Sequence, residues 1–479
     1  TAPGLAALFV PLTLAVGPVV AYNAASVLVT ALTAWTAYLL CRYVTNATWP
    51  SLAGGYLFGF SSYELAQQGH PNLTSVFCLP LIALVVLQAL DGRIGRRAFA
   101  IWLGLLIGAQ LWFSTEVAAT AVLALVLALG LAFWLAPDRR ARLGTLLRPL
   151  LGAGAVAVTI TSPLLYYLLT DFRGASLNPP AGYVSDLANF VVPTHLAEVG
   201  GSWSAGIAAL FPGNEFEQDA YVGLPAIAIL AIYLVPRRRQ PGARFLAAAV
   251  GVAVIASFGE ALHVAGRRIV VFPWWLVSHL PVLDNVLPTR LVVYSTLAAA
   301  VVAALWAAKS TAPRAVRAGL PALAALALFP NPTLSWWTRK PPLPQFFTAG
   351  YSSSCIRTGD NVVLIPWGYT GDSLLWQAVS GFHFRIAGGS LGGSGIASTF
   401  VGTIVSRLFN DHAHPGDGPA LVAFARSKGA STIVVDPADP QPWSSLLLQA
   451  FGPPTKTIGG VLLYQVSPGL VEDVACVAR

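Results

Sequence analysis

The sequence contains no methionine and few charged residues, and each scarcity narrows the kind of protein it can encode. Only 10% of its 479 residues are charged, against roughly 25% in an ordinary soluble domain. Hydrophobic residues make up 56% of the chain and its mean hydropathy is +0.67. One water-surrounded core cannot bury that much apolar surface. These values exclude a soluble enzyme and predict a polytopic membrane protein.

Cysteine is also scarce, and the familiar catalytic signatures are missing. The 4 cysteines do not follow the spacing of a zinc site, and no nucleotide-binding glycine fingerprint or Ser-His-Asp order occurs. Cys41 and Cys78 fall in apolar runs, where a thiol is usually a small buried side chain. The net charge of +8 does not indicate nucleic acid as a partner, because in a membrane protein the location of the charges carries the information.

The start of the sequence predicts a missing upstream segment. Position 1 is Thr, and no basic segment followed by an apolar signal core opens the chain. We therefore expect further residues before Thr1. Arginine far outnumbers lysine, and Ala, Gly and Pro are abundant. GC-rich codons produce such a usage, which favours a bacterial source.

Apolar runs of spanning length predict ten transmembrane helices. They lie at about residues 22–43, 50–63, 73–91, 98–114, 117–137, 149–170, 220–236, 244–260, 287–308 and 316–330. Residues 4–19 are also apolar but are interrupted by Pro11 and by Gly17-Pro18. This stretch is either an eleventh span or a helix in the membrane interface.

The basic residues predict the orientation of the spans. Lys and Arg fall in every second loop, for example at Arg93, Arg139 and Arg314, and such loops are cytoplasmic. The opposite face then receives nearly all carboxylates and every histidine. Its loops at 171–220 and 261–286 are too long to be mere connections. We therefore expect a multi-pass protein of the cell membrane whose chemistry faces outward.

The composition changes after residue 340, which predicts a membrane domain at 1–340 and an extracytoplasmic α/β domain at 341–479. The second domain is expected to have strands at 361–366, 431–436 and 460–466, and helices at 419–428 and 443–451. Cys355 and Cys476 lie near its two ends, on the oxidising side of the membrane. A disulfide between them is therefore plausible.

Three acidic positions in the expected outer loops are candidate catalytic groups. Glu64 shares its loop with His70, and such groups beside a membrane either act in function or solvate the loop and cap the next helix. Glu116 lies in a tight turn, where it can hold a metal ion or a sugar hydroxyl or favour a helix dipole. Glu217 belongs to a group of three nearby acids that can bind a divalent cation, accept a proton, or solvate a helix start.

Arg290 precedes the last long apolar run and is the candidate for binding a phosphate. A guanidinium makes bidentate contacts to phosphate oxygens, although an arginine here can also reach lipid headgroups. Arg267 and Arg268 are weaker candidates for the same role. The glycine-rich residues 388–395 lack the strand and lysine of a phosphate loop. Residues 411–414 contain two histidines but are more typical of a surface loop than of a metal site.

Several loose patterns in the chain resemble the C-type glycosyltransferase (GT-C) superfamily of polytopic membrane enzymes, including its YfhO-like and uncharacterised bacterial members. They are Gly17 to Asn23, Gly55 to Tyr63 with Gly69-His70, Ser185-Asp186-Leu187 with Pro193, Glu217 with Ala220 to Leu224, and Leu280-Pro281 with Pro288-Thr289-Arg290. The resemblance implies transfer of a sugar from a polyprenyl-phosphate donor to a glycan, lipid or protein acceptor of the cell envelope. A nucleotide motif is not needed for such a donor.

The resemblance also bears on the site residues. The catalytic Asp of that superfamily usually follows the first span, and here that loop would precede Thr1. Within the chain, Glu64, Glu116 and Glu217 are the candidate catalytic residues. His70, Asp186 and Arg290 are the candidate substrate contacts, and Mg or Mn is a candidate cofactor.

Two other functions compete with a transferase. A transporter or flippase is expected to have charged residues within its spans and repeat symmetry. A non-catalytic scaffold of envelope assembly would use the outer domain to bind a polymer or a partner. The spans are nearly free of charge and the acids collect in loops. This distribution favours the transferase over the transporter.

Overall fold

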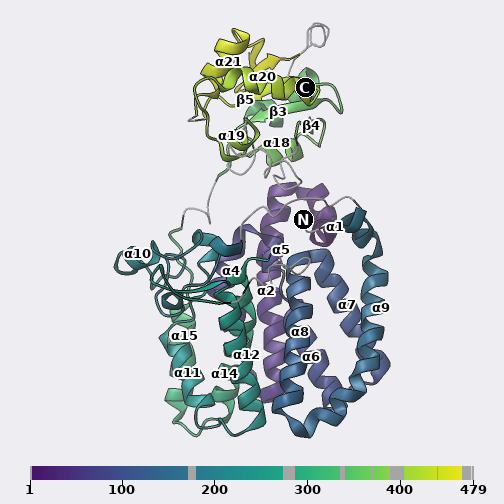
Figure 1. Ribbon diagram of the computed structural model, residues 1–479. Helices are drawn as coiled ribbons and strands as arrows, with labels where there is room; N and C mark the ends of the chain where they lie inside the picture. Colours follow the sequence, from purple (N-terminus) through teal and green to yellow (C-terminus); the bar gives the residue numbers. More distant parts are fainter. Residues whose placement is uncertain are drawn as a thin grey trace. The chain divides into compact units, whose positions relative to one another are not determined.

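The computed structural model describes residues 3–170, 180–272, 274, 286–334, 340–367, 372–388, 404–439, 441–466 and 476. The chain forms two compact units. The first, here called the membrane unit, contains most residues up to Trp337. The second, the C-terminal unit, contains Thr338–Arg479 together with Pro11–Ala21 and Thr170–Leu177. Figure 1 shows long helices in the former and a sheet-containing fold in the latter.

Helices account for most of the described chain before residue 335. They are α1 (Pro3–Val16), α2 (Pro18–Thr45), α3 (Thr48–Gly59), α4 (Ser62–Ala66), α5 (Pro71–Thr74), α6 (Cys78–Leu90), α7 (Arg96–Phe113), α8 (Thr115–Leu135), α9 (Arg140–Thr170), α10 (Ser202–Ala208), α11 (Leu224–Leu234), α12 (Pro241–Ser257), α14 (Val292–Lys309) and α15 (Arg314–Ala327). Short 3-10 helices include η1 (Gln67–Gly69), η4 (Leu187–Phe190), η5 (Glu215–Glu217) and η7 (Pro288–Leu291). One antiparallel hairpin, β1 (Ala261–Val264) with β2 (Arg267–Val271), follows α12.

Five helical stretches in the described chain are long and apolar enough to cross a membrane, so the membrane unit is a helical, membrane-embedded domain. They are Pro18–Thr45, Pro71–Leu90, Thr115–Leu135, Pro137–Thr170 and Pro288–Lys309. Every other predicted span is helical as well, but these helices are shorter or, like α7, begin with arginines. The expected count of ten to eleven transmembrane helices is therefore not confirmed.

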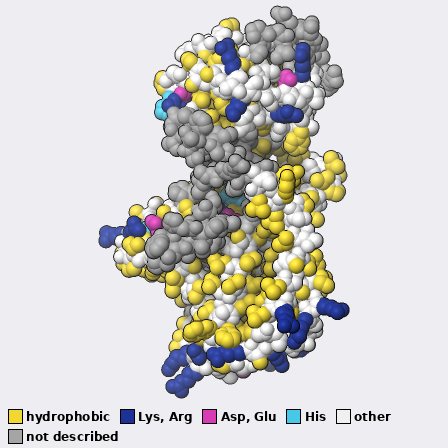
Figure 2. Space-filling model, turned by 45° about the vertical axis from the view of Figure 1, so that its right-hand side comes forward, with side chains coloured by type: hydrophobic (Ala, Val, Ile, Leu, Met, Phe, Trp, Pro, Cys, Tyr) yellow, Lys and Arg dark blue, Asp and Glu magenta, His cyan; other side chains and the backbone are white. Residues whose placement is uncertain are grey.

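Helix α14 is buried along most of its length and packs against α3, α11, α12 and α15. It packs against α3 through small residues. A Cβ added at Gly54 would lie 2.6 Å from Cys41 Sγ and 3.0 Å from the carbonyl oxygen of Ala300. Such close approach of backbones is typical of helix packing in membranes. Figure 2 shows the lysine and arginine side chains on the visible helical surface gathered mainly at one end.

The C-terminal unit contains a five-stranded sheet in the order β4-β3-β5-β7-β6. The strands are β3 (Asn361–Ile365), β4 (Arg385–Ile386), β5 (Ala430–Val435), β6 (Lys456–Ile458) and β7 (Val461–Gln465). The helices are α16 (Gln345–Thr348), α17 (Tyr351–Cys355), α18 (Ser373–Val379), α19 (Ile404–Asn410), α20 (Asp417–Ser427) and α21 (Trp443–Phe451). β3 is parallel to β4 and β5, whereas β7 is antiparallel to both of its neighbours. The three predicted strands and two predicted helices are confirmed.

Cys355, Cys476 and the residues around His412 and His414 contact other side chains within the C-terminal unit. Cys355 and Cys476 form a disulfide, with their Cα atoms 4.5 Å apart. Asp411 accepts a hydrogen bond from the indole of Trp443 at 2.8 Å. The neighbouring rings of His412 and His414 lie 5.7 Å apart. Of the glycine-rich residues 388–395, all but Gly388 lie outside the described part of the chain.

Candidate functional site

A tight turn between α7 and α8 places Glu116 at one end of the membrane unit. Helix α7 ends at Phe113, and the side chain of Ser114 caps α8 by accepting a hydrogen bond from the backbone N–H of Val117 at 3.3 Å. Glu116 is the second residue of α8. The arginines of α7 lie at its start, so this carboxylate is at the other end of the helices from those basic residues.

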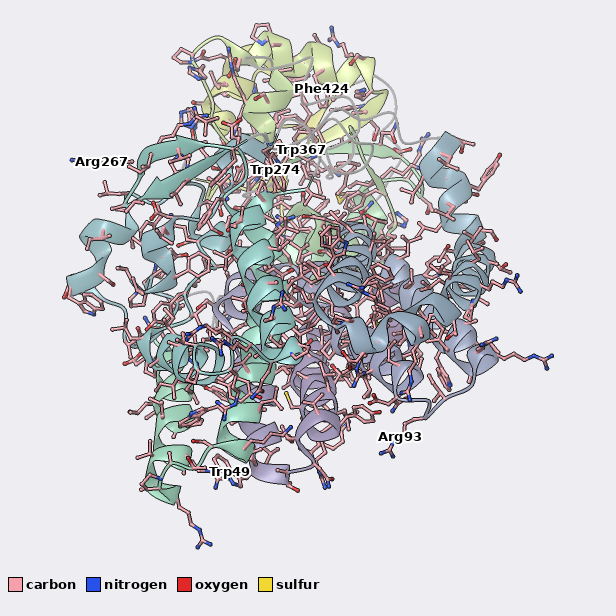
Figure 3. All side chains as sticks on the ribbon, turned by 60° about the horizontal axis from the view of Figure 1, so that its bottom comes forward. Trp49, Arg93, Arg267, Trp274, Trp367 and Phe424 are labelled. Carbon is pink, nitrogen blue, oxygen red and sulfur yellow. A yellow bond between two sulfur atoms is a disulfide. The ribbon has the colours of Figure 1, made fainter. Side chains whose placement is uncertain are left out.

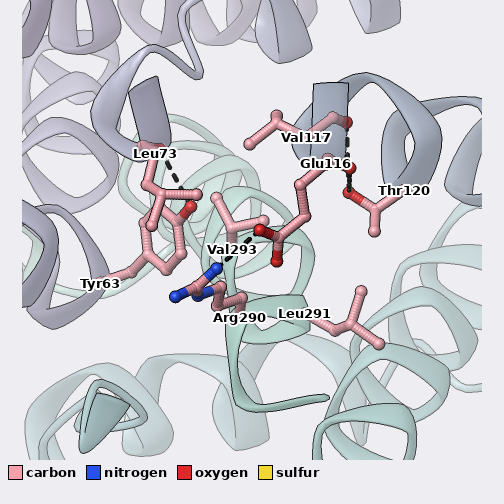
Figure 4. Close-up of a pocket in the computed structure, with 8 residues that line it drawn as sticks. All are labelled: Tyr63, Leu73, Glu116, Val117, Thr120, Arg290, Leu291 and Val293. Atoms are coloured by element: carbon pink, nitrogen blue, oxygen red, sulfur yellow. Dashed lines mark hydrogen bonds and ion pairs between the residues drawn. The ribbon is translucent and has the colours of Figure 1, made fainter. Parts of the chain in front are cut away.

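Arg290 joins Glu116 to Glu217 in a largely buried acid–arginine cluster, in which the three side chains are 16%, 24% and 4% exposed, respectively. Arg290 Nη1 lies 2.6 Å from Glu116 Oε2, and Nη2 lies 2.5 Å from Glu217 Oε1. Arg290 Nε also donates to both oxygens of Glu217, at 3.1 and 3.2 Å. Figure 4 shows the guanidinium pointing toward the Glu116 carboxylate. The contact of Arg290 Nε and Nη2 with Glu217 is bidentate, the geometry in which an arginine–carboxylate pair is strongest.

Residues next to the cluster extend its polar network. Gln67 Nε2 donates to the carbonyl oxygen of Phe216 at 2.7 Å and lies 3.4 Å from Glu217 Oε2. Thr289 Oγ1 lies 2.8 Å from Asp219 Oδ1 and 3.0 Å from the carbonyl oxygen of Glu217. These contacts hold the η5 and η7 segments together around the buried charges.

The remaining candidates lie at the edge of this network or outside it. The ring of His70 packs edge-on against Phe216, with 5.8 Å between centroids. Glu64 is in the short helix α4, which packs against η5. Asp186 is separate from the cluster, because its oxygens accept from the backbone N–H groups of Ala188, Ala265 and Gly266 at 2.7–2.9 Å. Asp186 thus anchors the turn of the β1–β2 hairpin.

Several alternatives considered for these residues are wrong because the side chains are buried. Glu64 and Glu217 are 0% and 4% exposed, so neither solvates a loop or a helix start. Arg290 does not reach toward lipid headgroups, because its nitrogens contact two carboxylates. Arg268 pairs with Glu260 at 3.6 Å rather than with the cluster.

The cluster includes residues that were not singled out as site residues from the sequence. Gln67, Asp219 and Thr289 each lie within three residues of a candidate. Asp219 also belongs to the acidic group that contains Glu217, and Thr289 to the Pro288-Thr289-Arg290 pattern. Glu217 and Asp219 are buried while Glu215, in the same acidic run, is exposed. The packing of this loop against α4 and η7 determines which of the three acids are buried, and the sequence alone does not show it.

Several buried acceptor atoms accept no hydrogen bond from the described residues. They are both carboxyl oxygens of Glu64, Gln67 Oε1, Glu116 Oε1 and Asp219 Oδ2. Burial raises the pKa of the Glu64 carboxyl well above its ordinary value. Burial, with a smaller contribution from the Glu217 carboxylate, raises the pKa of Asp219 in the same direction. Both acids are therefore biased toward the protonated, neutral form.

A small cavity adjoins the cluster. Tyr63, Leu73, Thr120 and the side chains of Glu116 and Arg290 contribute to its lining, as Figure 4 shows. Its volume of about 10 Å³ is close to what one water molecule needs. In this state the cluster accommodates a group the size of a hydroxyl rather than a sugar ring.

The sequence suggested Mg or Mn as a cofactor, but the described residues do not form a site for a divalent cation. They contain no group of three or more His, Cys, Asp or Glu side chains arranged to hold a metal ion. The Arg290 guanidinium occupies the position between Glu116 and Glu217 where a cation would bind.

The buried Glu64 predicts a pH-dependent stability that Glu64→Gln removes. A carboxyl whose pKa rises on folding contributes stability that is fully present below about pH 4.5 and is lost as the pH rises toward its folded pKa. We expect wild-type stability to fall relative to Glu64→Gln by up to about 1.4 kcal/mol per pH unit in that window. Thermal unfolding in detergent from pH 4.5 to 8 measures this difference. Parallel curves for the two proteins would show that Glu64 is ionised when folded.

A curated protein is similar to part of this chain. Undecaprenyl phosphate-alpha-4-amino-4-deoxy-L-arabinose arabinosyl transferase 2 of Pseudomonas fluorescens is 34% identical over 141 residues, which are 29% of this chain. The matched segment spans only 23% of that transferase. No protein-family model and no solved structure matches the chain. The chain is therefore similar, over less than a third of its length, to a protein named as an undecaprenyl phosphate arabinosyl transferase, and this match does not support a likeness to YfhO-like proteins.

Proposed function

We propose that this protein is a membrane glycosyltransferase that moves a sugar from a polyprenyl-phosphate donor to an envelope glycan, lipid or protein. The observation that carries the proposal is the partial match to a transferase named for an undecaprenyl-phosphate-linked sugar. The apolar helices supply a membrane location for such a donor. The buried acid–arginine cluster supplies a carboxylate and a cation close together.

The proposed orientation places the cluster on the outer face. Basic residues favour the cytoplasmic ends of membrane helices. Helix α7 begins with Arg96 and Arg97, and its other end leads to Glu116. The C-terminal unit is then extracytoplasmic, a placement that the Cys355–Cys476 disulfide favours because disulfides persist in oxidising compartments.

In the proposed reaction Glu116 is the general base. Its Oε1 atom has no hydrogen-bond donor among the described residues, and Glu116 lines the cavity that admits a hydroxyl. The carboxylate accepts the proton of the acceptor hydroxyl while Arg290 holds its other oxygen. The acceptor oxygen bonds to the anomeric carbon as the bond from that carbon to the phosphate oxygen breaks. The phosphate departs with the electron pair, and the configuration of the sugar inverts.

Glu217 positions Arg290 in this scheme, because both of its oxygens contact the guanidinium. Arg290 carries five N–H donors, and the two carboxylates engage the one on Nε and one on each of Nη1 and Nη2. The second N–H of each Nη nitrogen is the proposed contact to the leaving phosphate. The positive charge then stabilises the phosphate as it leaves. His70 lies beside Phe216, the residue before Glu217, and is the proposed contact to the sugar donor.

The test is sugar transfer by the protein encoded by the full gene, in membranes supplied with labelled polyprenyl-phosphate sugars. Glu116→Gln is expected to lower the rate about 10²- to 10⁴-fold, the usual contribution of a general base. Glu215→Gln is the matched control, because Glu215 is an exposed acid that pairs with His195. Unchanged transfer in Glu116→Gln, or no transfer from any such donor, would overturn the proposal.

A transporter or flippase is the second candidate, with one specific observation in its favour. Glu64 and Asp219 are buried acids whose raised pKa values suit proton uptake and release. Movement of a lipid-linked sugar driven by a pH gradient, without transfer to an acceptor, would support it.

If neither activity is found and the C-terminal unit binds an envelope polymer, the scaffold function is favoured.

A further inference from the structure

The β1–β2 hairpin of the membrane unit exposes apolar residues on both of its faces. Ile269, Val270 and Val271 are 58%, 47% and 67% exposed. Ile269 has no register partner in β1 and forms a bulge, whereas Val270 and Val271 are successive residues of the regular ladder and point to opposite faces of the hairpin. Both faces of β2 therefore carry exposed apolar side chains, whereas β1 is partly buried and packs against η4. Contiguous apolar surface of this kind marks an interaction site.

The hairpin is fixed to the membrane unit rather than loosely attached. Its turn residues Ala265 and Gly266 have φ values of +49° and +79°, and both donate backbone hydrogen bonds to the buried Asp186. The turn packs directly against the residues that follow α10. A Cβ added at Gly266 would lie 2.4 Å from the carbonyl oxygen of Leu210. The apolar hairpin is thus presented in a defined position.

Helix α10 adds exposed apolar residues beside the hairpin turn. Trp203, Ile207 and Leu210 are 64%, 39% and 56% exposed. Tryptophan is enriched where a protein meets the interface between lipid and water. The hairpin, α10 and Leu210 together form what we call the apolar shelf.

Chain connectivity puts the shelf at the level of the lipid headgroups. Helix α12 ends at Ser257 and β1 begins at Ala261, so the hairpin starts at most about 14 Å beyond the helix end. Ile255, in the last turn of α12, is an exposed apolar residue, and α12 packs against α14 and α8. The headgroup layer is about 5–7 Å thick on each side of the hydrocarbon core. The hairpin therefore starts within about 14 Å of the end of an apolar helix that packs against two candidate spans.

We propose that the apolar shelf docks onto the surface of the lipid bilayer, with Ile269 and Val271 entering the boundary between headgroups and acyl chains. Arg267 and Arg268 are placed to contact the phosphates of anionic lipids. Figure 3 shows Arg267 extending away from the hairpin. Apolar residues combined with arginines are the composition of elements that lie in the membrane interface. The proposal does not depend on the proposed function.

The experiment attaches an environment-sensitive fluorophore to Val271→Cys in the full chain in nanodiscs. Cys41 and Cys78 are buried and the other two cysteines form a disulfide, so labelling without reductant is selective for position 271. We expect about twofold stronger quenching by doxyl-labelled lipids than at the control Glu215→Cys, and weaker quenching by aqueous iodide. Glu215 is an exposed charged residue of the same unit.

A second comparison tests whether the positive charges of Arg267 and Arg268 contribute to contact with the lipids. Lipid quenching at position 271 is expected to be stronger in nanodiscs with anionic phosphatidylglycerol than in neutral phosphatidylcholine, and Arg267→Gln with Arg268→Gln is expected to remove that difference. Equal quenching in both lipids would overturn the role of the arginines. Free access of iodide and no lipid quenching would overturn the proposal and indicate a protein partner for the shelf.

Discussion

Replacing Arg290 with glutamine is expected to lower the free energy of unfolding by about 3–5 kcal/mol. The substitution removes the cation from between Glu116 and Glu217 and leaves both carboxylates without the guanidinium that they contact. An uncompensated buried charge is strongly destabilising, whereas an exposed ion pair contributes little. Thermal and denaturant unfolding of the purified protein in detergent measures the loss.

Arg268→Gln is the matched control for this prediction. Arg268 also pairs with a glutamate, but at 3.6 Å and with about half of each side chain exposed. Its replacement is expected to change stability by no more than about 0.5 kcal/mol. A second variant, Glu217→Gln with Arg290→Gln, removes one of the opposed carboxylates together with the cation and is expected to recover part of the loss. Equal unfolding midpoints for Arg290→Gln and Arg268→Gln would contradict the buried cluster.

The helices of the membrane unit were predictable because apolar runs of spanning length have few alternatives in a chain with so little charge. The runs at 22–43, 117–137 and 287–308 correspond to helices α2, α8 and α14. The shorter runs are helical too, but length and composition do not show that each crosses a membrane. Whether they do depends on tilt and on packing against neighbours, which hydropathy does not encode.

The cluster itself was not predictable as a unit. Glu116 and Glu217 were candidates separately, and Arg290 was expected to bind a phosphate. Their pairing joins residues 174 and 73 positions apart along the chain. No periodicity in one sequence reports such a contact, because it arises from how α8, η5 and η7 pack. Asp186 illustrates the converse, since a candidate substrate contact proves to anchor a turn.

In the C-terminal unit, burial and length explain why some strands were predicted from the sequence and others were not. β3 and β5 pair in parallel and are almost wholly buried, and each contains a run of consecutive apolar residues, VVLI in β3 and IVV in β5. β4 has two residues and β6 has three. Elements that short carry too few residues for an alternating pattern, and both lie at an edge of the sheet. They were missed for that reason.

Replacing Cys355 and Cys476 by serine is expected to lower the stability of the C-terminal unit by about 4–5 kcal/mol. The two cysteines are 121 positions apart, so their bond closes a loop that spans nearly the whole unit. A crosslink across a long loop restricts the unfolded chain, and the restriction grows with loop length. The expected result is a lower unfolding midpoint for the signal of the buried tryptophans Trp376 and Trp443.

The same loss of stability should follow chemical reduction of the wild-type protein. Equal losses would show that the disulfide bond, and not the change of side chain to serine, accounts for the effect. Reductant is expected to lower the wild-type midpoint to that of the double serine variant and to leave the variant unchanged. Cys41 and Cys78 are free and buried in the membrane unit, so reduction does not alter them. A double variant as stable as the oxidised wild type would mean that the sheet core alone holds the unit together. The predominantly apolar packing of β3, β5 and β7 would then suffice without closure of the loop.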